Sequence, residues 1–239
     1  MVLMYDTILF DADNTIFNNF DIHITVTKRI LKDLKRPEIV VEDLHLKWDF
    51  HYFSEQKKTF DEFGFCIDKE NNARSLIKAL NEFEIDIPFE QALDYWKYMI
   101  EEYSEKSKPF VDVPEMLEFF AENKVKMAIV SNGDFEIINN RLQKAKLEHY
   151  FEFVVAPCEE IPLSKPNEAF FNKSLEIINS TPEKTIYVGD NPEADIMGGN
   201  KAGVFTVLID RDDLFTELEG LEIPNKKIKS FIELKEIFS

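Results

Sequence analysis

Short apolar runs rich in β-forming residues alternate with amphipathic stretches through the second half of the chain. Including one near the start, five such runs predict strands, over residues 6–10, 126–130, 151–156, 185–188 and 204–209. Apolar residues at three- and four-residue steps predict helices over residues 114–123, 135–145 and 167–178. This alternation indicates an α/β fold, with a parallel sheet covered by helices on both faces.

A long helical segment separates the first predicted strand from the second. Apolar residues at helical spacing mark residues 22–34, 69–83 and 89–105. A plain crossover between parallel strands needs only about a dozen residues, and this gap is far longer. We therefore expect an inserted all-helical domain over residues 18–108, with a core domain formed by residues 1–17 and 109–239.

The net charge of the chain limits the kinds of molecule that it can bind. The 46 acidic and 28 basic residues give a net charge of −18, and such a field repels nucleic acid and anionic membranes. We expect neither as a partner. A small phosphorylated substrate would then need a metal ion or a local patch of positive charge.

Cysteine usage and the N-terminal segment bear on location. The two cysteines, Cys66 and Cys158, form no multi-bridge framework and no zinc-site spacing. The N-terminal segment has no basic leader, and no apolar run approaches the length of a membrane span. We expect a cytoplasmic protein, and a monomer and a homodimer both remain open.

Two aspartates stand at the end of the first predicted strand. In an extended strand, side chains two residues apart point to the same side, so Asp11 and Asp13 would face one site. Two carboxylates this close repel each other unless a cation or a shared proton lies between them. Carboxylates suit a hard divalent ion such as magnesium. The alternative is that both residues merely cap the following turn.

Further polar residues follow the later predicted strands. Ser131 and Asn132 end the second strand, where a hydroxyl and backbone N–H groups can hold phosphate oxygens. Lys165 precedes a predicted helix, with Pro166 in its first turn, and a cation there is unfavourable unless an anion lies nearby. Each feature alone also fits an ordinary turn or a solvated surface lysine.

The fourth strand ends at Asp190, in the same position relative to its strand as Asp11. Asp195 lies one helical turn further on. Ligands of parallel α/β sheets bind beyond the carboxyl ends of the strands. Asp11, Ser131, Lys165 and Asp190 all stand at or after such ends, and together they offer what phosphoryl transfer requires: positioning, a metal and charge neutralisation.

Four motifs in this order resemble the haloacid dehalogenase superfamily. They are DADNT at 11–15, SNG at 131–133, SKPN at 164–167 and GDNPEAD at 189–195. The resemblance covers the whole core and implies a Rossmann-like sheet, with the helical insertion resembling the family's C1-type cap. The core motifs look most similar to the pyrimidine or nucleoside 5′-nucleotidase and small-metabolite phosphatase branch.

The resemblance also implies roles for the residues at the first two motifs. Asp11 would be the nucleophile that becomes phosphorylated, and Asp13 would protonate the leaving oxygen and then activate water. Thr15 would position the loop after the strand and belongs to the expected substrate-binding set. Ser131 and the Asn132 backbone would bind phosphoryl oxygens.

The last two motifs would neutralise charge and bind the metal. Lys165 would neutralise charge on Asp11 and bind the phosphate. Magnesium would bind the Asp11 carboxylate, the Asp13 backbone carbonyl and Asp190. Asp195 would lie just outside these ligands or reach the ion through water.

The resemblance implies a magnesium-dependent hydrolase of small phosphate monoesters, such as a nucleoside monophosphate or a sugar phosphate, acting through an aspartyl-phosphate. Asp13 disfavours the dehalogenase branch, because a halide leaving group needs no proton whereas an alkoxide does. A phosphomutase similar to β-phosphoglucomutase would share all four motifs and stays an alternative. A non-catalytic phospho-switch is a weaker one. The aromatic stretch 48–53 would either stack on substrate or pack in the helical core.

Overall fold

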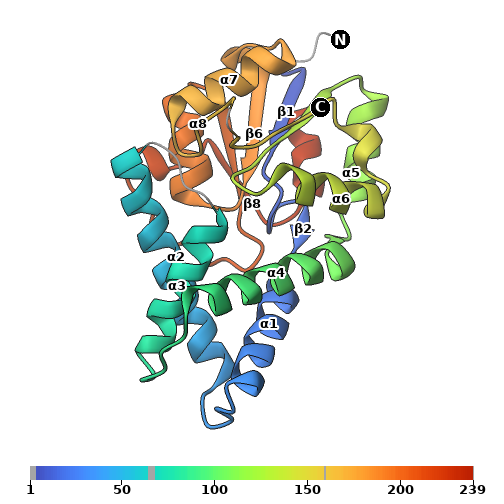
Figure 1. Ribbon diagram of the computed structural model, residues 1–239. Helices are drawn as coiled ribbons and strands as arrows, with labels where there is room; N and C mark the ends of the chain where they lie inside the picture. Colours follow the sequence, from blue (N-terminus) through green and yellow to red (C-terminus); the bar gives the residue numbers. More distant parts are fainter. Residues whose placement is uncertain (1–3, 64–67, 159, 239) are drawn as a thin grey trace. The chain divides into compact units, whose positions relative to one another are not determined.

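The computed structural model describes residues 4–63, 68–158 and 160–238, which leaves Cys66 outside the described residues. The chain divides into two compact units (Figure 1). The core unit holds Met1–Asn18 and Lys108–Ser239, and the inserted unit holds Asn19–Ser107. The domain boundaries predicted from the sequence differ from these by one residue at each of the two boundaries.

A six-stranded sheet forms the centre of the core unit, in the order β5-β4-β1-β6-β7-β8. Every neighbouring pair in it is parallel. The strands are β1 (Thr7–Phe10), β4 (Lys126–Val130), β5 (Phe153–Val155), β6 (Thr185–Gly189), β7 (Phe205–Ile209) and β8 (Lys226–Ile228). The predicted α/β class with a parallel sheet is therefore confirmed.

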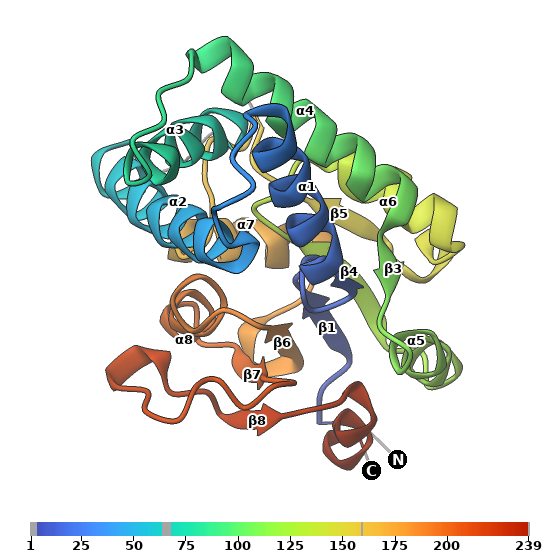
Figure 2. The same cartoon turned by 90° about the horizontal axis from the view of Figure 1, so that it is seen from below.

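Side-chain alternation along the strands gives the sheet two apolar faces. Ile8 and Phe10 point to the face covered by α5 (Val113–Glu122) and α6 (Phe135–Ala145). Leu9 points to the opposite face, which α7 (Glu168–Ile178) covers. Figure 2 shows α5 on one side of the strands and α8 (Gly198–Lys201) on the other. Because helices cover both faces of the sheet, the strands are apolar along their length, and polar side chains are found where the strands end.

Two details of the core differ from the sequence prediction. β8 was not predicted, because it has only three residues and two of them are lysines. Pro166 does not lie in the first turn of a helix: α7 begins at Glu168, and the Asn167 side chain caps it by accepting from Ala169 N. Asn167 takes the cap position because its side-chain oxygen satisfies a helix N–H that has no partner within the helix.

The inserted unit is a four-helix arrangement of α1 (Phe20–Asp33), α2 (Val41–Phe63), α3 (Asp68–Asn81) and α4 (Phe89–Lys106). α1 and α3 each pack against both α2 and α4 around a separate apolar core. Within the aromatic stretch of α2, Trp48 is buried in this core while Phe50 and Phe53 are exposed. The core-packing interpretation therefore holds for Trp48 only. None of the helices in the described ranges is long and apolar enough to cross a membrane.

The chain leaves and re-enters the core through two adjacent short strands. β2 (Phe17–Asn18) pairs antiparallel with β3 (Lys108–Pro109). Phe110 N also donates to the Ile16 carbonyl at 2.9 Å, which extends the pairing toward the sheet. This ribbon fixes both ends of the insertion at one place on the core unit.

Asp112 joins the start of α5 to the C-terminal segment. Its Oδ2 accepts hydrogen bonds from Arg211 Nη1 at 2.9 Å, Ser230 Oγ at 2.7 Å and Phe231 N at 2.9 Å. Burial acts to raise the pKa of the Asp112 carboxyl, but the hydrogen bonds and the Arg211 charge outweigh it and hold that pKa below its ordinary value.

We expect Asp112→Asn to lower the free energy of unfolding by about 1.5–3 kcal/mol at pH 7, the range for hydrogen bonds to a charged group. A carboxyl with a lowered folded-state pKa contributes stability above its unfolded pKa and loses it as the pH falls through the folded value. Urea unfolding at pH 7 and at pH 3 should therefore show a smaller difference between the two proteins in acid. Glu115→Gln, which alters an exposed ion pair on the same helix, is the matched control; an equal loss in both variants would contradict the prediction.

Candidate active site

The ammonium of Lys165 lies at the centre of a buried polar cluster in the core unit. Its Nζ donates to Asp11 Oδ1 at 2.5 Å, to Asp195 Oδ1 at 2.7 Å and to the Tyr187 hydroxyl at 2.9 Å. The side chains of Lys165, Asp11 and Asp195 are 3%, 8% and 1% exposed. Three distant segments of the chain therefore meet at one charge, where β1, β4 and β6 end.

Burial and crowding shift the pKa values of these groups. Burial raises the pKa of Asp11, Lys165 lowers it, and Asp195 and Asp13 raise it further, with a result of about 6. Burial also raises the pKa of Asp190 well above its ordinary value, and the charges of Asp11 and Asp195 add to that rise. Burial acts to lower the pKa of Lys165, but its two carboxylate partners raise it, so the ammonium stays charged. The site has more carboxylates than one lysine neutralises.

Asp195 and Tyr187 hold Lys165 in place. The Tyr187 hydroxyl lies 2.9 Å from both the Val130 carbonyl oxygen and Asp195 Oδ1. The other oxygen of Asp195 accepts from Asn191 N at 2.9 Å. A side chain at Gly189 would place its Cβ 2.3 Å from Asp195, so only glycine allows this carboxylate to lie against the end of β6. Asp195 thus holds the ammonium of Lys165 while its own position is fixed by Asn191 N.

Ser131 and Asn132 follow β4, and Asn132 contacts Lys165. The Ser131 hydroxyl is buried and accepts from Gly133 N at 3.3 Å. The Asn132 side chain accepts from Lys165 N at 2.8 Å and donates to the Lys165 carbonyl at 3.0 Å. The sequence predicted a role only for the Asn132 backbone, whereas the amide side chain fixes the main chain that carries Lys165.

Asp13 lies after the end of β1, at the start of a tight turn. β1 ends at Phe10, and the chain then turns tightly, with Asn14 at φ 53° and Phe17 N donating to the Ala12 carbonyl. The two aspartates nevertheless lie near each other, as expected, and the charge of Asp13 raises the pKa of Asp11. The turn arises because the Ala12 carbonyl accepts from the backbone ahead instead of from a neighbouring strand.

Arg141 on α6 binds the Asp13 carboxylate. Its Nη1 donates to Asp13 Oδ1 at 2.6 Å, and its side chain is 2% exposed against 39% for Asp13. The guanidinium lies 4.3 Å from the centre of the Phe17 ring. An arginine fork packed on a ring has few orientations, so Arg141 orients the Asp13 carboxyl group.

Three carboxylates form a group that could hold a metal ion. Asp11, Asp190 and Asp195 each offer an oxygen within 4.8 Å of the others. Thr15 contacts this group, because its buried hydroxyl lies 3.5 Å from Asp190 Oδ1. An all-oxygen set of this kind suits a hard divalent cation. Lys165 contacts one oxygen of Asp11 and one of Asp195, and the other oxygen of Asp195 accepts from Asn191 N. The second oxygen of Asp11 and the carboxylate of Asp190 are therefore the most available to an ion.

Two residues of this site were not identified from the sequence. Arg141 lies six residues into a helix, where the sequence pattern gives no reason to separate it from a surface arginine. Tyr187 lies in the middle of β6 and reads as an apolar strand residue. A tyrosine at an otherwise aliphatic position of a buried strand is a weak signal, because its hydroxyl needs a partner.

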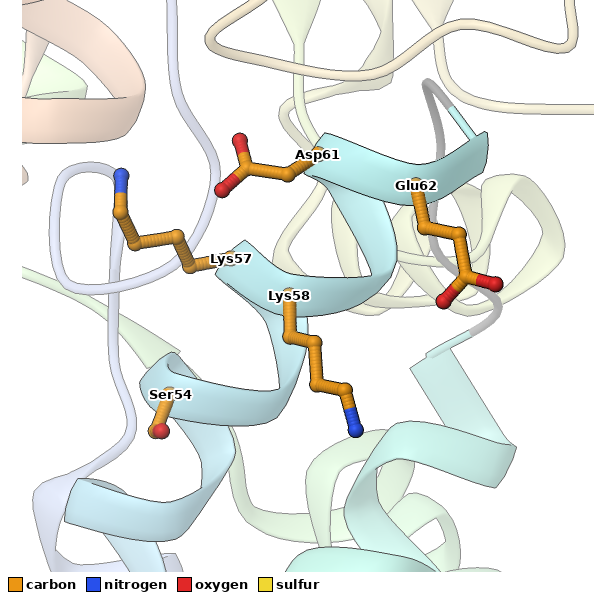
Figure 3. A pocket seen from close by; sticks show the side chains of 5 residues that line it. All are labelled: Ser54, Lys57, Lys58, Asp61 and Glu62. Atoms are coloured by element: carbon orange, nitrogen blue, oxygen red, sulfur yellow. The ribbon is translucent and has the colours of Figure 1, made fainter.

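A separate hollow of about 420 Å³ lies along α2 in the inserted unit, lined by Ser54, Lys57, Lys58, Asp61 and Glu62. Figure 3 shows Lys57 and Asp61 extending to one side of the helix and Lys58 and Glu62 to the other. Charges spaced four residues apart on one helix are typical of a solvated face. The hollow contains none of the predicted catalytic residues.

A model of the haloacid dehalogenase-like hydrolase family matches residues 8–209. The chain belongs to this family. The match extends from β1 to the end of β7, so it includes the four motifs, the strands that carry them and the helical insertion. The resemblance stated from the motifs is therefore confirmed.

Named relatives and solved structures of this family resemble the chain over different lengths. A pyrophosphatase named PpaX from Bacillus mycoides is 26% identical over 85% of this chain and 83% of its own. A phosphoglycolate phosphatase from Aquifex aeolicus is 34% identical over 47% of this chain and 52% of its own. The structure of the hydrolase YfnB from Bacillus subtilis has a TM-score of 0.81 at 22% identity, covering 98% of both chains. The L-2-haloacid dehalogenase of Xanthobacter autotrophicus has a TM-score of 0.76 at 17% identity over 98% of both, and both structures share the fold.

We expect Asp190→Asn to stabilise the metal-free protein at pH 7.5. A carboxyl whose folded-state pKa is raised costs stability as the pH rises through the interval between its unfolded and folded pKa, and the amide removes that cost. An expected gain of roughly 1 kcal/mol would raise the melting temperature by about 2–4 °C in a chain of this size. Thermal unfolding of both proteins in the presence of a chelator measures this difference in melting temperature.

The same melting experiment tests cation binding. Mg²⁺ should raise the melting temperature of the wild type, because it binds the folded state only, and should do little for Asp190→Asn. Asp94→Asn, an exposed change on α4, is the control and should behave as the wild type. Equal stabilisation of all three proteins by the cation would contradict a site at Asp190.

Proposed function

We propose that the protein is a magnesium-dependent phosphatase that hydrolyses a small phosphate monoester through an aspartyl-phosphate on Asp11. The observation that carries the proposal is the cluster of Asp11, Lys165 and Asp190 at the carboxyl ends of the strands, with Ser131 directly after the neighbouring strand β4. Relatives named as phosphatases and pyrophosphatases support the reaction class.

The residues of the cluster suit the steps of phosphoryl transfer. Asp11 supplies a carboxylate oxygen that attacks phosphorus, and the alkoxide leaves with its bonding electrons. Lys165 neutralises charge on Asp11 and on the phosphoryl oxygens, with Asp195 and Tyr187 holding its ammonium. Ser131 and the backbone of Asn132 donate to phosphoryl oxygens.

Magnesium is the cation proposed for the carboxylate set. Asp11 and Asp190, with the Asp13 carbonyl, would hold the ion, and the carboxylate chemistry of the donors fits it. When bound, the ion would neutralise negative charge on the phosphate and on the carboxylates. Thr15 would orient the Asp190 carboxylate for the ion through the contact of its hydroxyl with that group.

Asp13 separates a phosphatase from a dehalogenase. An alkoxide leaving group takes a proton from Asp13, which then takes a proton from the water that attacks the aspartyl-phosphate. A halide needs no such acid. The likeness to dehalogenase structures is below 25% identity and concerns the fold, so it gives no support to dehalogenation. The mutase alternative differs in its product, an isomerised sugar phosphate with little free phosphate.

The substrate class is best resolved by a panel of phosphorylated metabolites. We propose a small phosphorylated metabolite as the partner, without nucleic acid, and a cytoplasmic enzyme that is monomeric or homodimeric. The panel should contain nucleoside monophosphates and sugar phosphates, because the core motifs resemble that branch. Inorganic pyrophosphate belongs in it as well, because the relative matched over most of the chain is named as a pyrophosphatase.

We expect Asp11→Asn to abolish magnesium-dependent release of phosphate from 4-nitrophenyl phosphate. The amide lacks the charge and nucleophilicity of the carboxylate, so activity should fall by at least about 10⁴-fold, as when a nucleophile is lost. Asp212→Asn, an exposed aspartate of the same unit, is the matched control and should retain wild-type turnover. An active Asp11→Asn protein, or a wild type inactive with every panel member, would rule out the mechanism.

Arg141 should matter most for substrates whose leaving group needs a proton. We expect Arg141→Met to slow hydrolysis of an alkyl phosphate by about 10²-fold, within the range for general acid catalysis, because Asp13 loses its orienting partner. The same variant should change the rate with 4-nitrophenyl phosphate much less. Steady-state kcat/KM on both substrates measures the difference, because it reports the step that expels the leaving group and not the later hydrolysis of the aspartyl-phosphate.

Two further variants separate orientation from folding. Asp13→Asn should show the same dependence on the leaving group, and Arg141→Lys should recover part of the alkyl-phosphate rate because it keeps a cation near Asp13. If Arg141→Met slowed both substrates equally, Arg141 would have only a structural role.

A further inference from the structure

A second group of potential metal ligands lies within the inserted unit, apart from the carboxylates of the core. It consists of His23 on α1 and of His45 and Asp49 on α2, whose ligand atoms all lie within 4.8 Å of one another. We propose that these three side chains bind a divalent metal ion of the zinc class.

The separations of the three side chains suit such an ion. His45 Nε2 lies 3.4 Å from Asp49 Oδ2, and His23 Nδ1 lies 4.0 Å from Asp49 Oδ1. A tetrahedral zinc ion with bonds of about 2.0–2.2 Å holds its ligand atoms roughly 3.3–3.5 Å apart. The His45–Asp49 pair already has this spacing, and the His23–Asp49 pair, measured to the other carboxylate oxygen, is wider.

Local structure orients all three side chains toward one point. His45 and Asp49 are four residues apart on α2, so they project from the same face of the helix. The other ring nitrogen of His23, Nε2, is hydrogen-bonded to the Tyr103 hydroxyl of α4. Metal-binding histidines usually carry such a partner on the nitrogen that does not bind the ion, because it fixes the ring.

The chemistry of the donors selects the metal. Two imidazoles and one carboxylate suit zinc, cobalt or nickel, whereas magnesium prefers oxygen ligands and water. The three side chains of the inserted unit therefore prefer a different metal ion from the carboxylates of Asp11 and Asp190. Three protein ligands leave one tetrahedral position open to water or to an anionic group.

The side chains lie where bulk water only partly reaches. His45 is 9% exposed, His23 29% and Asp49 40%. His45 and Asp49 come from one helix and His23 from another, so a bound ion would join α1 to α2. Since the ion binds the folded arrangement, it would also stabilise the inserted unit.

The test uses the full-length Asp190→Asn protein, in which the carboxylate set of the core is impaired. After chelation, Co²⁺ is titrated and its visible d–d absorption recorded, with Zn²⁺ and Mg²⁺ as competitors. We expect one equivalent of Co²⁺ with tetrahedral absorption, displaced by Zn²⁺ and not by an excess of Mg²⁺. No turnover is measured, so the result is independent of whether the proposed phosphatase activity holds.

Variants of the ligands identify the site. His45→Gln and Asp49→Asn should each weaken Co²⁺ binding by at least about 100-fold, and Tyr103→Phe by about tenfold through loss of the ring's outer partner. His51→Gln is the matched control, because His51 lies on the same helix but pairs with Glu82. Circular dichroism checks that each variant folds, and the half-exposed Asp49 decides the outcome if His45→Gln does not fold. Absence of tetrahedral Co²⁺ binding, or equal affinity in Asp49→Asn and His51→Gln, would overturn the proposal.

Discussion

The site depends on the positive charge of Lys165, which the core unit buries among acids. An unpaired ammonium in such a place would be very unfavourable, and Lys165 is stable there because it donates to two carboxylates and a phenol. Those contacts also draw together the end of β1, the segment before α7 and the turn after β6. Removing the lysine would leave the carboxylates of Asp11, Asp190 and Asp195 close together without the cation that offsets their mutual repulsion. The local excess of acid that remains even with the lysine is the physical reason why a cation fits this edge of the sheet.

The strand ends are the part of this site that sequence reasoning could reach. Parallel strands in one sheet bring their carboxyl ends to one edge, so Asp11, Ser131 and Asp190 could be grouped without coordinates. Lys165 could be added because a cation beside a helix start calls for an anion. These inferences work because strand periodicity and topology are set by long apolar patterns, which tolerate errors of one or two residues.

Contacts made across the sheet or between helices could not be predicted in this way. Arg141 approaches Asp13 from α6, and nothing in the spacing of that helix indicates which arginine turns inward. Tyr187 occupies a strand position where phenylalanine would serve the packing equally, and only its hydroxyl contacts show its purpose. Elements of two or three residues, such as β2 and β8, carry too few residues to form a pattern. In α2 the choice between buried Trp48 and exposed Phe50 depends on neighbouring helices that the local sequence does not specify.

The β2–β3 ribbon has a consequence for how such a chain can change over time. The segments that leave and re-enter the core are hydrogen-bonded to each other, so the two ends of the helical insertion lie as close together as the ends of a hairpin loop. Loop length changes closure entropy only slowly, so the insertion could grow, shrink or be exchanged while the register between β1 and β4 stays the same. Recombination could then replace the inserted unit during evolution without changing the core unit, which carries the residues of the candidate active site.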